Sequence, residues 1–144
     1  MTRPRRPLPQ PTPETQPLWD GAKRHELWIQ QCQACHQHYF YPRPYCPHCL
    51  SDNTRWVRAS GRGTLHTFSI NHRPAPGFEG MAPYIIAVVE LAEGPRMMTN
   101  LVGIDPDPAK LTKDMSVEVV FQDLTDEITL PLFRPATSEA GGAP

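Results

Sequence analysis

Apolar and polar residues alternate through much of the second half of the chain. Over residues 66–72 the alternation has a period of two, which predicts a strand with one solvated face. Residues 84–91 are apolar at nearly every position, so we expect a central strand covered on both faces. Further strands are predicted for three segments that are separated by Gly-Pro and Asp-Pro breaks: residues 96–104, 115–122 and 128–133. Pro131 assigns the last of them to an edge or a bulge.

The number and length of these strands favour closure into a barrel. Five short strands within about 70 residues cannot shield both faces of an open sheet. A closed barrel removes the exposed edges, and the five-stranded OB-fold barrel is the usual solution at this length. The sequence therefore predicts a mainly β protein whose second half is an OB-fold barrel.

The first half has a different pattern. Apolar residues recur at helical spacing over residues 14–26, although Gly21 weakens this helix. Residues 27–31 have the pattern of a short strand that leads into the first cysteines. Six of the 18 prolines fall within the first 17 residues, which predicts an extended, polyproline-like arm before the helix.

All four cysteines fall in one pattern. Cys32 and Cys35 form one C-x2-C pair, Cys46 and Cys49 form a second, and ten residues separate the pairs. Two such knuckles aim four thiolates at one point and complete the tetrahedral shell that Zn2+ prefers. A closed shell leaves no open position for water. We therefore expect a structural zinc in a rubredoxin-like ribbon, with a binding energy that supports folding of that segment.

Three other interpretations of the cysteines stay open. Iron in a rubredoxin-like site also takes four thiolates. Disulfides suit an oxidising compartment, but no apolar signal segment follows the N-terminal arginines. Cys32 to His36 matches the C-x-x-C-H motif of haem attachment, yet the same cysteines already have a matching second pair. We favour zinc, and we expect His36 and His48 to be surface residues beside the ligands.

Charge divides the chain near Gly63. Residues 1–63 hold nine Lys and Arg against four acids, whereas residues 64–144 hold five against eleven. The longest apolar-rich run, residues 83–89, is too short to cross a bilayer. We therefore expect a cytoplasmic protein without membrane contact.

These patterns divide the chain into four predicted segments. They are a disordered proline-rich arm (1–13), the helix and zinc ribbon (14–60), the OB-fold barrel (61–135) and a disordered tail (136–144).

A long loop separates the first two barrel strands. Long loops in compact domains commonly bind something. His66 and His72 share one face of a predicted strand, but no nucleophile or carboxylate stands at a spacing that suggests a catalytic partner. We therefore expect no catalytic residue in the chain, and we consider this loop a candidate contact for a partner or substrate through Arg73, Pro74, Phe78 and Pro83.

Many short motifs occur in a specific order over about four fifths of the chain. They are Leu18-Trp19-Asp20-Gly21, Gln31-Cys32-Gln33-Ala34-Cys35, Tyr41 to Cys49, Ser60 to Thr64, His72-Arg73-Pro74, Pro83-Tyr84, Glu90-Leu91, Thr99 to Gly103 and Leu130 to Pro135. In this order they resemble a family of bacterial and archaeal proteins associated with acyl-CoA metabolism, domain of unknown function 35, which joins a zinc ribbon to an OB fold. Lys113-Asp114-Met115 departs from the family, which often has a glycine there.

The resemblance implies a non-catalytic partner of a thiolase-fold acyl-CoA enzyme. Such partners support thiolytic acyl transfer or retro-aldol cleavage in degradative pathways, and one related pair acts on benzoylsuccinyl-CoA. The catalytic cysteine and histidines would then belong to the partner, with a CoA thioester at the interface. A chain whose cysteines are all committed to a metal agrees with this division of roles.

Two other functions stay open. A single-stranded nucleic-acid-binding OB protein needs a basic groove with stacking aromatics, whereas the barrel half of this chain is acidic. We therefore expect a hetero-oligomer with a thiolase-fold subunit and no nucleic acid. The other function is that of a stand-alone acyl-CoA-binding protein, which would contact the CoA phosphates through Arg43, Arg55, Arg58 and Arg62.

Overall fold

The computed structural model describes residues 9–73, 80 and 82–136. These residues form one α-helix, one short 3-10 helix and eight strands. The elements are α1 (Gln16–Lys23), β1 (Trp28–Cys32), β2 (His38–Tyr39), β3 (Thr54–Arg58), β4 (Arg62–Asn71), β5 (Tyr84–Leu91), β6 (Arg96–Leu101), η1 (Pro108–Lys110), β7 (Ser116–Asp123) and β8 (Thr129–Pro135). None of the helices in the described part of the chain is long and apolar enough to span a membrane.

The last five strands close into a barrel in the order β4-β5-β6-β8-β7, and β7 pairs back onto β4. All strand pairs are antiparallel except β6 and β8, which are parallel and have one register pair, Leu101 and Phe133. This arrangement confirms the predicted mainly β fold and its OB-type barrel. Pro131 lies on β8 beside the sparse β6–β8 seam, where its missing N–H costs little.

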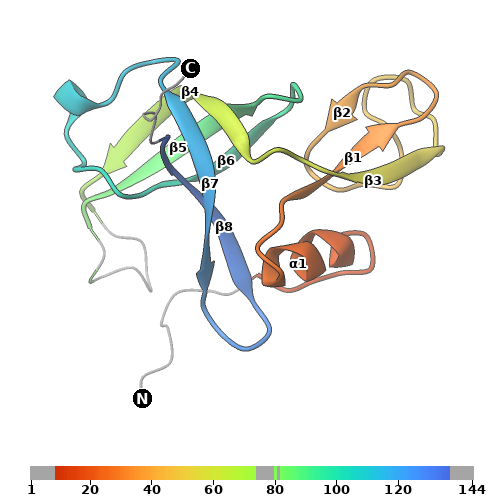
Figure 1. Cartoon of the computed structure of the whole chain (residues 1–144), viewed down its shortest axis with the longest axis horizontal. Helices are drawn as coiled ribbons and strands as arrows, with labels where there is room; N and C mark the ends of the chain where they lie inside the picture. The colour runs from red at the N-terminus through yellow and green to blue at the C-terminus, as the bar shows by residue number, and fades with distance from the viewer. Residues whose placement is uncertain (1–8, 74–79, 81, 137–144) are drawn as a thin grey trace.

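The ribbon is a small separate sheet in the order β2-β1-β3. Figure 1 shows this sheet beside the barrel, with α1 lying below both and the chain passing from β3 directly into β4. Helix α1 contacts β1 on one side and β8 on the other. Its buried Leu18 belongs to a single core cluster with Ile29 of the ribbon sheet and Leu65 of the barrel. The ribbon and the barrel therefore share one hydrophobic core.

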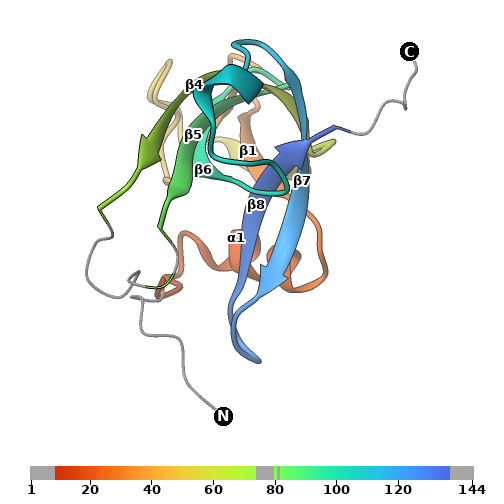
Figure 2. The same cartoon turned by 90° about the vertical axis from the view of Figure 1, so that its left-hand side faces the viewer.

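One end of the barrel is covered by the connection between β6 and β7. Figure 2 shows this connection, which carries η1, crossing the barrel near β4 and β7. Asp107 caps η1 by accepting a hydrogen bond from the Ala109 N–H at 2.9 Å. Leu111, directly after η1, is buried and joins the core cluster. Leu111 of this connection thus covers that end of the barrel with an apolar side chain.

Strand β5 corrects one prediction from the sequence. Its burial alternates strictly: Ile85, Ala87, Val89 and Leu91 are buried, and the residues between them are half-buried. The expectation of two fully covered faces is wrong because a barrel strand turns only one face to the interior. Helix α1 is also shorter at both ends than the helix predicted over residues 14–26, and the ribbon strands β2 and β3 were not predicted.

Gly63 is expected to be required for closure of the barrel. It pairs with Leu91 of β5 and with Val117 of β7, and a Cβ at this position would collide with the Glu90 carbonyl oxygen. Gly63→Ala should therefore destabilise the protein by about 1–3 kcal/mol, measured by urea unfolding. Gly80→Ala is the matched control, because a Cβ there meets nothing within 4 Å. Equal free energies of unfolding for the two variants would contradict the expected requirement for glycine at position 63.

Candidate metal centre

The four cysteines converge on one point at the tip of the ribbon. All are free thiols, and their sulfur atoms lie within 4.8 Å of one another. The Cys32 and Cys49 sulfurs are 3.5 Å apart, and the Cys35 and Cys46 sulfurs are 3.7 Å apart. A tetrahedral zinc with Zn–S bonds of ~2.3 Å has sulfur–sulfur edges of about 3.8 Å. The donor set therefore fits a four-thiolate metal site.

Backbone dipoles prepare this site for thiolates. The N–H groups of Ala34 and Cys35 donate to the Cys32 sulfur at 3.3 and 3.4 Å, and the His48 N–H donates to the Cys46 sulfur at 3.3 Å. The donation from Cys35, followed by that from Ala34, outweighs burial and lowers the pKa of Cys32 to about 6. The first thiolate of the site is thus formed near neutral pH.

The pKa of the Cys49 thiol is shifted in the opposite direction, upward. The Ser51 N–H lowers the pKa of Cys49, but the contact with the Cys32 sulfur and desolvation together raise it to about 12. Four adjacent thiols cannot all ionise without a compensating cation, whereas a divalent metal deprotonates coordinating thiols. Binding of a divalent metal ion would therefore allow all four thiols of the cluster to ionise. Once four thiolates hold it, no coordination position is left for a substrate.

The ribbon beneath the cysteines is well ordered by local hydrogen bonds. Cys32 and Cys46 are fully buried with Tyr39 in a small second core. The Tyr39 hydroxyl donates to the Arg43 carbonyl oxygen at 3.1 Å, and the Arg43 N–H donates to the Gln30 side-chain oxygen at 2.8 Å. Buried Gln30 and Tyr39 thus fix the chain between the two knuckles.

The structure does not gather the four arginines that the sequence suggested for CoA phosphates. Arg55 donates to the Gln31 side chain, whereas the Arg43 N–H donates to the Gln30 side chain. Successive residues of a strand point to opposite faces, so Arg43 and Arg55 lie on opposite faces of the ribbon sheet. Arg58 pairs with Glu26 at 3.6 Å, and Arg62 begins β4 in the barrel.

The candidate binding loop is only partly described. Pro74 and Phe78 lie outside the described residues. The Arg73 N–H donates to the Asn71 side chain at 3.2 Å. Pro83 follows a cis peptide bond and lines a pocket of about 300 Å3 with Tyr84 and Asn100. The loop's role as a partner or substrate contact stays a prediction.

Two grooves border the junction of the ribbon and the barrel, and neither was predicted from the sequence. One is apolar, with a volume of about 360 Å3, and lies between α1, the segment after β2, and strands β6 and β8. The other is polar, with a volume of about 560 Å3, and lies between the ribbon and the β5–β6 turn. Each combines residues far apart in the sequence, so no local motif marks it.

Comparison with known proteins defines the class of protein. Residues 19–55 match the family described as "ChsH2, rubredoxin-like zinc ribbon domain". Residues 56–122 match "ChsH2, C-terminal OB-fold domain". A solved structure named "Ltp2-ChsH2(DUF35) aldolase" has a TM-score of 0.77 and 38% identity, over 88% of this chain and 98% of that chain.

Two curated relatives extend this result. A "DUF35 domain-containing scaffold protein" of Methanothermobacter thermautotrophicus is 33% identical over 106 residues, which are 73% of this chain and 78% of that protein. A "Probable enoyl-CoA hydratase alpha subunit" of Thermomonospora curvata is 43% identical over 122 residues, which are 84% of this chain. The chain spans only 37% of the length of that hydratase subunit. This chain belongs to the DUF35 family of ChsH2-like proteins, which combine a zinc ribbon with an OB fold.

Proposed function

We propose that this chain is the zinc-binding, non-catalytic subunit of a hetero-oligomeric acyl-CoA enzyme of a degradative pathway, whose catalytic residues lie on a thiolase-fold partner. The main support for this proposal is the share of a solved structure's chain that this chain matches. The chain corresponds to 98% of a chain in a structure named for the pair Ltp2 and ChsH2. A second relative is named a scaffold protein. Both names describe proteins that assemble with others.

The chemistry of the metal centre supports a non-catalytic role. Acyl transfer through a thiolase-type mechanism needs a free cysteine as nucleophile. Here all four cysteines of the chain belong to one metal-binding cluster. A zinc held by four thiolates has no open position at which to polarise a carbonyl oxygen. Nucleophile and base would therefore be supplied by the partner, while zinc holds the ribbon in shape.

Exposed apolar side chains near the apolar groove support docking of a partner. Tyr41 and Met98 are 49% and 60% exposed, and the Tyr41 hydroxyl accepts a hydrogen bond from the Met98 N–H at 3.3 Å. Both line the apolar groove together with Trp19 of α1. Aromatic residues and methionine are enriched in the buried centres of protein interfaces. Met98 is therefore a suitable position at which to probe docking.

Coexpression with a candidate thiolase-fold partner protein tests the proposal. We expect the two to co-purify, and we expect the thiolase to show full thiolytic or retro-aldol activity only in the complex. Met98→Glu should weaken the complex at least about tenfold, because it places a charge in a desolvated contact. Thr112→Glu, which adds the same charge at an exposed position, is the control. Full activity of the thiolase alone, without co-purification, would reject the proposal.

A hydratase is the second candidate partner. It is favoured by the 43% identity to part of a protein named as an enoyl-CoA hydratase alpha subunit. Coexpression with a candidate hydratase subunit separates the two candidates, because only the true partner should retain the chain through size-exclusion chromatography.

A further inference from the structure

The polar groove between the ribbon and the barrel has walls of distinct chemistry. The ribbon wall carries His36, His38, Arg43 and His48, and the barrel wall carries Glu93 and Arg96 around the β5–β6 turn. Five of these six side chains offer N–H donors. The groove thus presents many hydrogen-bond donors and one carboxylate, whose Oε1 on Glu93 is buried without a hydrogen-bond partner among the described residues.

The donors of the ribbon wall are largely unused. Among the residues that the structure describes, none of the three imidazole rings forms a hydrogen bond. Arg43 is exposed, and its side chain donates only through Nε, to the Tyr41 carbonyl oxygen at 3.4 Å. Unpaired donors that line one groove are the arrangement expected of a binding site for an anion with several oxygens.

The position of Arg43 is fixed, although its guanidinium is exposed. The Arg43 N–H donates to Gln30, and the Arg43 carbonyl oxygen accepts from Tyr39. Gln30 and Tyr39 are only 6% and 2% exposed, so they hold this backbone segment rigidly. A backbone held on both sides lowers the entropy lost when the side chain binds a ligand. Arg43 is thus presented to the groove from a fixed base.

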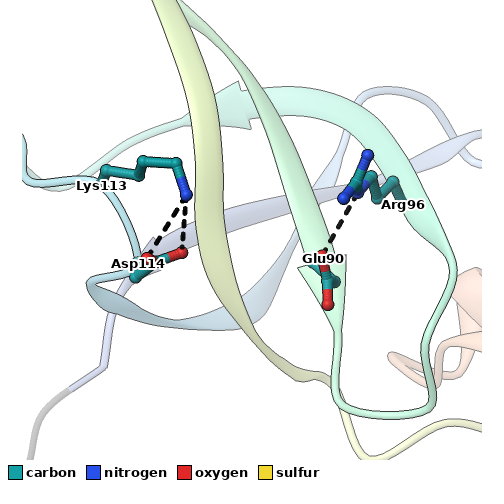
Figure 3. Close-up of polar contacts among 4 residues, drawn as sticks. All are labelled: Glu90, Arg96, Lys113 and Asp114. Atoms are coloured by element: carbon teal, nitrogen blue, oxygen red, sulfur yellow. Dashed lines mark hydrogen bonds and ion pairs between the residues drawn. The ribbon is translucent and has the colours of Figure 1, made fainter.

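The barrel wall is also held in place. Figure 3 shows Arg96 of β6 reaching across to Glu90 of β5, where its Nε lies 3.2 Å from a carboxylate oxygen. This ion pair engages the Nε of Arg96, and no hydrogen bond is found for its terminal Nη groups among the described residues. Glu93 accepts a hydrogen bond from the Ser60 N–H at 2.8 Å, so the turn is tied to the segment before β4. Arg96 can therefore complete a site begun by Arg43.

We propose that the polar groove binds the phosphate groups of the nucleotide end of a CoA thioester. This assignment rests on the proposed function for its ligand class, and it selects Arg43 from the four arginines that the sequence suggested. Arg43 and Arg96 face the phosphate oxygens, and the imidazoles of the ribbon wall donate further hydrogen bonds. The apolar groove, with its Trp19 and Met98, is chemically unsuited to phosphate.

Two competing occupants fit the groove less well. A second metal ion would need at least three ligands close together, and the cysteine cluster is the only such group found among the described residues. A nucleic-acid strand would need a continuous basic track with stacking aromatics. Of the two aromatic rings in this groove Tyr39 is buried and Phe40 is half-buried, and the acidic Glu93 interrupts the barrel wall.

Calorimetry on the zinc-loaded chain, alone and in complex with its partner, tests the proposal. The ligands are CoA, pantetheine, which has no phosphate, and inorganic phosphate. We expect pantetheine to bind at least about tenfold more weakly than CoA, since charge-assisted hydrogen bonds to phosphate are lost. Arg43→Ala should weaken CoA binding at least about tenfold and leave pantetheine binding unchanged. Arg43→Lys should restore part of the affinity.

Arg62→Ala is the matched control, because Arg62 is exposed on β4 and lies outside the lining of the groove. It should leave the affinity for CoA within about twofold, and the zinc content of every variant should equal that of the parent chain. Equal affinities of the parent chain for CoA and pantetheine, unchanged CoA affinity in Arg43→Ala, or tighter binding of a single-stranded oligonucleotide than of CoA would overturn the proposal.

The outcomes also separate this proposal from the proposed function. If the complex with the thiolase forms but CoA affinity ignores Arg43, the groove assignment fails while the subunit role stands. If CoA binding depends on Arg43 but no partner co-purifies, the groove assignment holds and the subunit role fails. The groove assignment is also overturned if the isolated chain does not bind CoA and Arg43→Ala leaves CoA binding by the complex unchanged.

Discussion

Cys32→Ser is expected to abolish metal binding and to unfold the ribbon. Cys32 is fully buried, and its sulfur accepts two backbone N–H groups and contacts the Cys49 sulfur. The binding energy of a structural zinc, about 10–16 kcal/mol in zinc-finger peptides, is folding energy for a segment with little core of its own. We therefore expect a loss of about 5 kcal/mol or more, visible as free amide exchange over residues 28–58.

Zinc content by mass spectrometry and hydrogen exchange together measure this effect. Treatment of the parent chain with a strong chelator should reproduce the exchange pattern of the variant. Ala34→Ser lies in the same knuckle at an exposed position and should keep both zinc and protection. A metal-free ribbon that keeps its exchange protection would show that zinc is not what holds it together.

Phe133→Ala is expected to produce the largest loss of stability in the barrel. Phe133 is fully buried and pairs with Val119 of β7 and Leu101 of β6. Its carbonyl oxygen also accepts a hydrogen bond from the Val102 N–H at 2.8 Å. Removal of a buried phenyl ring costs about 3–5 kcal/mol, which corresponds to a fall in Tm of about 10 °C or more.

Thermal and urea unfolding of the zinc-loaded protein check this value. Leu50→Ala serves as the control, because Leu50 is an apolar residue that is 76% exposed, and it should change stability by less than about 0.5 kcal/mol. A similar small effect at Phe133 would mean that the barrel repacks around the missing ring and that closure does not depend on this residue.

The barrel was predictable because its strands carry a strong local signal. The strand predicted over residues 84–91 forms with those bounds, and the strand predicted over residues 115–122 forms one residue later, over 116–123. The ribbon strands β2 and β3 carry a weaker signal, since β2 has only two residues and β3, although it holds the β-favouring Trp56 and Val57, lacks a clean apolar alternation. They form because the two cysteine knuckles bring their backbones beside β1. The pairing of both strands with β1 thus depends on contacts between segments that are distant in the sequence.

The candidate sites divide in the same way. The gathering of the four cysteines was predictable because each C-x2-C pair is a local motif. The arginines were not, because the alternation of Gln30 and Gln31 on β1 decides which face each arginine joins. The polar groove brings His36 and Arg96 together across 60 positions of the sequence. Only the packing of the ribbon against the barrel reveals it.

The shared core of the ribbon and the barrel has a consequence for assembly. Leu27 and Ile29, at the ribbon side, belong to the same cluster as Leu65 and Phe133 of the barrel. If the proposed subunit role holds, loss of the metal is therefore expected to loosen the surface on which the partner would rest. By linkage, the metal raises the affinity of the chain for a partner that binds only the folded form. That partner raises the affinity of the chain for the metal by the same factor. Zinc supply in the cell would then act as a control on the amount of assembled enzyme.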